Sequence, residues 1–172
     1  MNYFKFSREE TFSLALIIVM VFSRLVPHPP NFTPIIAVGV MSGYYFKDLN
    51  YSILVLLIIM LLSDLFIGFY SNMIFVYLSL LLITIFSFKL TNKINIKNLF
   101  IFGFLSSLLF YIVSNFGFWV FGSLYSKNIA GLIECYVMAI PFFKNTLIST
   151  IIYLYVGFLL INFLKTFRLN KS

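Results

Sequence analysis

Charged residues are scarce in this sequence, and acidic ones are scarcer still. Of its 172 residues, 10% are charged, with 12 Lys and Arg against 5 Asp and Glu, whereas 62% are hydrophobic and 20% aromatic. An average soluble domain is about half apolar and about a quarter charged. The composition therefore excludes an ordinary soluble protein and predicts a single integral membrane domain that covers residues 1–172.

The residues from which most catalytic and metal sites are built are also missing. One cysteine and one histidine exclude an internal disulfide and give no metal-ligand pattern. Asp64 is the only carboxylate inside an apolar segment, whereas an intramembrane aspartyl protease needs two. His28 falls in a loop, away from any serine inside a span, and no phosphate-binding loop motif occurs. We therefore expect a protein that is not an enzyme and that holds no metal and no cofactor.

Long apolar segments are what the chain does have, and six of them predict an all-α membrane bundle of six helices. The last four segments are each about 20 residues long, or about 30 Å of helix, which matches the hydrocarbon core of a bilayer. The second has only about 14 residues, which burial among its neighbours would permit. The expected spans are residues 11–26, 33–46, 51–70, 72–90, 99–122 and 145–164.

The basic residues predict how the bundle is oriented. They lie at segment ends and not in aromatic-interleaved patches, so we expect the lipid bilayer, and no nucleic acid, as a partner. Cytoplasmic loops are enriched in Lys and Arg, which predicts a multi-pass inner (plasma) membrane protein with both termini in the cytoplasm. The inner side then holds Lys5, Arg8, Lys47, Lys89, Lys93, Lys97, Lys165, Arg168 and Lys171, and the outer side holds Arg24, Lys127 and Lys144.

Other polar residues gather near the outer ends of these helices, which favours a ligand site there. Longer outer loops would be a simpler explanation of the same bias. The loop between the fifth and sixth spans, residues 123–144, is the longest. Its apolar residues recur at helical spacing, which predicts a short interfacial helix that lies over the outer mouth and ends at Pro141.

Two residues could form an ion pair at this outer level. Asp64 lies inside the third span, where a charge normally faces a partner or a wet cavity. Arg24, near the outer end of the first span, is the expected partner. The pair could contact a ligand or carry a proton, or it could only hold two helices in register.

Residues on the later helices extend this candidate site. Tyr111, Asn115 and Trp119 fall on one face of the fifth span, which favours a wall that stacks on a ligand and hydrogen-bonds to it; Trp also favours the membrane interface for its own reasons. On the sixth span, small and polar residues at every fourth position from Asn145 to Gly157 are typical of helix packing, although Asn145 at the mouth could touch a ligand.

The second span carries further packing and capping signals. Gly39 and Gly43 form a GxxxG motif, which predicts close helix packing. Thr33 before Pro34 predicts a helix start with a capping hydroxyl at Thr33 and a proline at the first helical position. The helix N-terminus would then face the outer site, where its dipole favours a negative ligand group.

Four stretches resemble an uncharacterised family of small bacterial membrane proteins described as transport proteins: PHPPNFTPIIAVGVMSGYYF, SDLFIGFY, SNFGFWVFGSLY and GLIECYVMAIPFFKNTL. That family is similar in plan to the substrate-binding S components of energy-coupling-factor (ECF) vitamin transporters. The resemblance implies six helices, cytoplasmic termini and a ligand bound under the outer loops. It also implies a membrane scaffold subunit and two ATPases as partners. The first span lacks the alanine-x-x-x-alanine pattern with which many S components dock, having only Ser13 and Ala15.

Together these features predict the solute-binding subunit of an importer for a small-molecule substrate. Trp119, Tyr125 and Tyr136 indicate a planar, vitamin-like metabolite, and Arg24, Lys127 and the helix N-termini indicate an acidic group on it. A non-transporting accessory subunit, or a standalone secondary transporter with Asp64 as proton carrier, is the alternative. The expected ligand-binding residues are Arg24, His28, Asn31, Asp64, Asn115, Trp119, Tyr125, Glu134, Tyr136 and Asn145.

Overall fold

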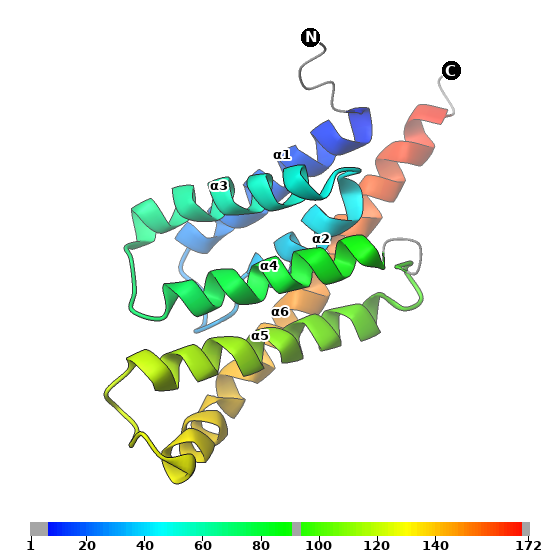
Figure 1. Ribbon diagram of the computed structural model, residues 1–172. Helices are drawn as coiled ribbons and strands as arrows, with labels where there is room; N and C mark the ends of the chain where they lie inside the picture. The colour runs from blue at the N-terminus through cyan, green and yellow to red at the C-terminus, as the bar shows by residue number, and fades with distance from the viewer. Residues whose placement is uncertain (1–6, 91–93, 170–172) are drawn as a thin grey trace.

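The computed structural model describes residues 7–90 and 94–169 and shows an all-helical fold in this part of the chain (Figure 1). Successive helices run in alternating directions, so that α1 begins and α6 ends at the same end of the bundle. The expected six-helix, all-α architecture is confirmed. The elements are α1 (Arg8–Phe22), the short 3₁₀ helix η1 (Ser23–Leu25), α2 (Ile35–Tyr45), α3 (Leu49–Ile67), α4 (Met73–Lys89), α5 (Leu99–Phe121) and α6 (Ile129–Leu169).

Three of the described helices are long and apolar enough to cross a membrane: α3, α5 and the Ile129–Leu164 part of α6. The helices α2 and α4 are apolar but shorter. Large hydrophobic side chains such as Phe66 and Leu65 are exposed on the outside of the bundle, where a soluble protein would place polar ones. These features support association with a membrane.

The short helix α2 lies at the centre of the bundle, in contact with all five other α-helices. Residues 35–43 are all buried. A Cβ atom added at Gly43 would collide with the backbone of Thr84 and Phe88, and Thr84 Oγ1 donates a hydrogen bond of 3.1 Å to the carbonyl of Gly39. The GxxxG motif therefore packs α2 against α4, as predicted. Because its neighbours surround it, α2 does not need to match the thickness of the hydrocarbon core.

The polar ladder of α6 also packs inside the bundle. Ser149 is fully buried, and the Tyr153 hydroxyl lies 3.3 Å from Oγ of Ser23. A Cβ atom at Gly157 would come within 2.7 Å of Sδ of Met41. The small residues of this face therefore let α6 approach α1 and α2, which confirms the packing interpretation.

The prediction for the α5–α6 connection is wrong. The helix α6 continues through Pro141 without interruption, so no separate interfacial helix ends there, and the connection comprises only residues 122–128. A proline inside a helix removes one backbone hydrogen bond. Here Tyr111 and Tyr136 fasten the first part of α6 to α5, since the Tyr111 hydroxyl donates to the Tyr136 carbonyl and the Tyr136 hydroxyl donates to the Ile112 carbonyl. These contacts fix the part of α6 that precedes Pro141 against α5.

Two other boundaries differ from prediction. The helix α2 begins at Ile35 after Pro34 and has no side-chain cap, so Thr33 is not its capping residue. The helix α3 ends at Ile67, because Gly68 takes a φ of 100° that breaks the helical path. Asp64 consequently lies in the last turn of α3, closer to the end of the helix than expected.

Candidate functional site

A cavity of about 580 Å³ opens at the end of the bundle where α1, α3 and α5 end and α2, α4 and α6 begin. Its wall combines η1, the 26–34 loop, the residues between α3 and α4, the first turns of α2 and α4, the C-terminal half of α5, the 122–128 connection and the first half of α6. Pockets of a few hundred cubic ångströms are typical of small-molecule sites. The cavity lies at the end where the sequence predicted a ligand site.

Aromatic rings make up much of the cavity wall. Tyr111 and Phe143 pack with their ring centroids 5.0 Å apart, and Phe118 and Tyr125 pack edge to face at 6.3 Å. Such rings offer flat apolar faces on which a planar ligand can stack. The aromatic lining residues are Tyr70, Phe110, Tyr111, Phe118, Tyr125, Phe142 and Phe143.

Several polar side chains in the wall have no hydrogen-bond partner among the described residues. Asn31, Thr33 and Asn72 make no side-chain hydrogen bond to the described residues, although all three line the cavity. Asn31 has a φ of 59°, a left-handed conformation that asparagine tolerates better than most residues. Asn115 donates from Nδ2 to the Tyr111 carbonyl at 2.8 Å, and its Oδ1 has no partner in the described part of the chain. The wall therefore offers both donors and acceptors to a polar ligand.

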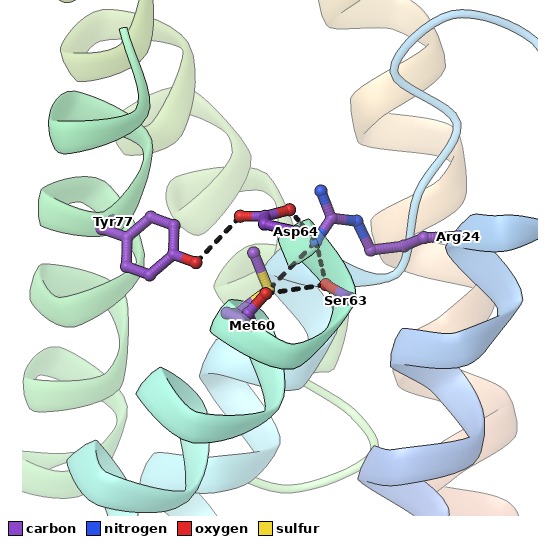
Figure 2. Close-up of polar contacts among 5 residues, drawn as sticks. All are labelled: Arg24, Met60, Ser63, Asp64 and Tyr77. Carbon is purple, nitrogen blue, oxygen red and sulfur yellow. Dashed lines mark hydrogen bonds and ion pairs between the residues drawn. The ribbon is translucent and has the colours of Figure 1, made fainter. Parts of the chain in front are cut away.

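The predicted contact between Arg24 and Asp64 is present at the bottom of this wall (Figure 2). Nη1 of Arg24 lies 2.9 Å from Oδ1 of Asp64, and it donates to Ser63 Oγ at 2.6 Å. From the opposite side, the Tyr77 hydroxyl donates to Oδ2 of Asp64 at 2.8 Å. The group therefore joins the end of α1 to α3 and α4.

The two members of the pair have different access to the cavity. Asp64 is fully buried and does not line it, whereas Arg24 does, with 8% of its side chain exposed. A buried charge is tolerated when a partner compensates it. The carboxylate of Asp64 thus holds the guanidinium of Arg24 in the cavity wall from behind.

The comparisons with known proteins place the chain in a family without assigning it an activity. Residues 4–171 match a group described as "Family of unknown function (DUF6580)". The chain belongs to this family. Searches of curated proteins and of solved structures give no significant match. The site of this family member therefore has to be interpreted from its own residues.

Four of the ten expected ligand-binding residues line the cavity: Arg24, Asn31, Asn115 and Tyr125. Asp64 lies directly behind Arg24. His28 and Glu134 are exposed, and Nδ1 of His28 lies 2.9 Å from the adjacent Pro29 carbonyl. The structure does not bring these two residues to the cavity wall.

The other three expected residues are bonded to the protein itself. Trp119 donates from Nε1 to the Ser126 carbonyl at 2.9 Å. Tyr136 is part of the α5–α6 contact described above. Asn145 donates from Nδ2 to the Pro30 carbonyl at 3.0 Å and so ties the 26–34 loop to α6.

Lys127 also has a structural role in this family member. Its ammonium donates to the Val120 and Gly122 carbonyls at 3.0 and 2.5 Å and to the Trp119 carbonyl, and it lies 5.5 Å from the Trp119 ring centroid. A cation at a helix C-terminus satisfies free carbonyls and the helix dipole. Lys127 therefore caps α5 and is not directed at a ligand.

The cavity residues on α6 were missed because the sequence was divided at Pro141. Cys135, Ala139, Phe142 and Thr146 all line the cavity. They recur at i, i+4, i+7 and i+11, which is one face of a continuous helix. This spacing was visible in the sequence and would have joined the two halves of α6.

Proposed function

We propose that this chain is the membrane-embedded solute-binding subunit of an importer for a small, planar, vitamin-like metabolite. The observation that supports this most is the cavity, which combines a suitable volume, aromatic rings and unbonded side-chain amides. A planar metabolite would stack on rings such as Tyr125 and hydrogen-bond to Asn31 and Asn115.

The proposal includes the placement of the chain in the membrane. We propose six crossings of the inner membrane, both termini in the cytoplasm and the cavity open to the outside, on the basis of the distribution of Lys and Arg. An ECF-type scaffold subunit and two ATPases are the proposed partners, by resemblance to S components. The first helix lacks the usual small-residue docking pattern, so the scaffold contact would use a different surface.

The accessory-subunit alternative makes a contrary prediction about this end of the bundle. It expects the outer polar residues to bond to one another with no cavity between them. Trp119, Tyr136 and Asn145 are hydrogen-bonded to backbone carbonyls of the protein and not to one another, and a cavity of about 580 Å³ lies beside them. The cavity therefore favours ligand binding over a purely structural role.

Cys135 provides a direct test of the proposed function. It is the only cysteine of the chain, it is buried, and it lines the cavity. Purified protein is treated with N-ethylmaleimide, with and without a small-molecule fraction from cells, and labelling is followed by mass spectrometry. We expect a component of the fraction to slow the labelling of Cys135 and to be recovered bound to the protein.

A matched variant separates protection from indirect effects. In Cys135→Ala with Glu134→Cys, the thiol moves one position along α6 to an exposed site outside the cavity wall. The same fraction should leave labelling of this variant unchanged. If no fraction slows labelling of Cys135, or if only bilayer lipid is recovered from the cavity, the proposed function is wrong.

A further inference from the structure

The charges around the cavity are already balanced without a ligand. Among the lining residues, Arg24 is the only one with a side chain that is charged at neutral pH. Its guanidinium is paired with Asp64 at 2.9 Å. Lys127, which the sequence suggested as a second positive group, is used by the C-terminus of α5. No uncompensated positive charge therefore faces the cavity from the described residues.

Arg24 is nevertheless part of the cavity wall. Its Nη1 meets Asp64, Ser63 and, at 3.6 Å, Sδ of Met60 (Figure 2), and its side chain also hydrogen-bonds with the hydroxyl of Tyr70, another lining residue. Nε is buried and has no hydrogen-bond partner among the described residues. Since Arg24 lines the cavity with 8% of its side chain exposed, a ligand in the cavity comes close to this paired guanidinium.

A ligand carboxylate beside Arg24 would be the third charge of this cluster and its second negative charge. Asp64 is fully buried behind the same guanidinium, so the two carboxylates would share one positive charge in a poorly solvated place. Juxtaposed like charges of this kind carry a large cost. A carbonyl oxygen accepts the same hydrogen bonds without adding charge.

We infer that the ligand presents an uncharged acceptor to Arg24: a planar heterocycle with a carbonyl or amide group, and not a carboxylate. The inference rests on the proposed function and changes the acidic ligand that the sequence suggested. The amides of Asn31 and Asn72 and the free Oδ1 of Asn115 fit the remaining edge of such a ring, because each amide oxygen accepts from a ring N–H and each amide nitrogen donates to a ring acceptor.

Matched probes test the inference without knowledge of the natural ligand. The probes are two pairs of compounds that share a ring: nicotinamide with nicotinate, and uracil with orotate. The second member of each pair carries a carboxylate and the first does not. For each probe, the concentration that halves the rate of Cys135 labelling is measured in the wild-type protein. We expect the uncharged member of each pair to protect at on the order of tenfold lower concentration, because it avoids the like-charge contact.

Two variants should reverse this preference by adding net positive charge to the site. Asp64→Asn keeps the shape of the side chain but frees the guanidinium charge. Asn72→Lys places an ammonium in the wall at a position that has no side-chain hydrogen bond to lose, so it stays informative if Asp64→Asn fails to fold. In both variants, nicotinate and orotate should protect Cys135 from labelling at a lower concentration than nicotinamide and uracil.

The outcomes separate the inference from the proposed function. A wild-type preference for nicotinate and orotate, an unchanged preference in both variants, or no protection by any probe at millimolar concentration overturns the inference. Protection of Cys135 by a cellular metabolite would still support the proposed function in those cases. If no cellular fraction protects Cys135 from labelling, both the inference and the proposed function are wrong.

Discussion

Asp64 is a fully buried carboxylate whose two oxygens face different helices. Oδ1 meets Arg24 from the end of α1, and Oδ2 accepts from Tyr77 of α4. Removal of one member of a buried ion pair leaves the other charge without compensation. We therefore expect Asp64→Ala to lower the free energy of unfolding by about 3–5 kcal/mol, measured by denaturant unfolding in detergent with the single tryptophan as the fluorescent reporter.

The double variant Arg24→Met with Asp64→Leu serves as the control for this prediction. It removes both charges and retains apolar volume, so it should destabilise the protein less than Asp64→Ala alone. A double variant as unstable as the two single changes added together would show that the residues do not act as a pair.

The Tyr77 hydroxyl is the second residue-scale contact that can be tested. Tyr77→Phe removes the hydrogen bond to Asp64 and leaves a buried acceptor with one partner fewer, which should cost about 1–3 kcal/mol. Tyr44→Phe is the matched control, because no hydrogen bond of the Tyr44 hydroxyl is seen among the described residues. Equal stability of the two variants would contradict the role of Tyr77.

At the scale of elements, the contact between α2 and α4 depends on the absence of a side chain at Gly43. A Cβ atom there meets the backbone of α4, which cannot move as a flexible side chain would. Gly43→Ala should therefore destabilise the protein by about 1–3 kcal/mol through overpacking. At Gly39 the nearest atom to an added Cβ is a methyl group of Ile83 at 3.3 Å, so Gly39→Ala should cost less in the same unfolding assay.

A second contact between elements is sensitive to pH. At the polar start of α1, Ser7 and Glu10 form a capping box, and Oε1 of Glu10 accepts from the Lys47 backbone at 3.2 Å. Burial alone would raise the pKa of Glu10, but its hydrogen bonds to Ser7 and Lys47, with the charge of Lys47, lower it below 4.5. The ionised carboxylate thus ties α1 to the α2–α3 connection.

The sign of the pH dependence follows from this lowered pKa. A carboxyl group whose pKa is lowered on folding stabilises the folded state when the pH lies above its pKa in the unfolded chain. This contribution is lost as the pH falls through the pKa of the folded state. Gln can still form the capping box, so Glu10→Gln should remove the charge contribution alone and cost about 0.3–1 kcal/mol at neutral pH. The difference from wild type should shrink below pH 4.5. A constant difference across that range would contradict the prediction.

Helix number and helix packing could be predicted at this scale, whereas some boundaries could not. The apolar runs and the Gly39–Gly43 motif carry their information locally, so the sequence was sufficient for them. Where α6 continues through Pro141, its first part is bonded to α5 by contacts of Tyr136 that join distant parts of the chain. A local proline signal pointed the other way and was overridden by this packing.

At the scale of the whole molecule, the sequence predicted the end of the bundle at which the candidate site lies, but it did not predict which residues form the wall. Charge and polarity along the chain placed the candidate residues at one end of the bundle. Which of them face inward depends on how each helix is rotated, and the rotation is set by packing across the bundle. Asn115 therefore lines the cavity, whereas Trp119, one turn further along α5, bonds to the following connection.

The orientation of the molecule gives a further prediction. In the Cys135→Ala background, cysteines are introduced at Lys144 and Lys97, two exposed positions expected on opposite sides of the membrane. A membrane-impermeant maleimide added to intact cells should label Lys144→Cys and not Lys97→Cys, with both labelled after permeabilisation. The reverse pattern would place the cavity on the cytoplasmic side.

The central position of α2 also has a consequence for how the protein is made. A helix of 11 residues is about 16 Å long, well short of the roughly 20 residues that a segment needs to enter a bilayer by itself. Only the three residues 46–48 separate α2 from α3, so the two segments leave the ribosome nearly together and can insert as a hairpin. Under the proposed membrane placement, we expect the biogenesis of the bundle to be cooperative, because its innermost helix is enclosed only once the surrounding helices have been synthesised.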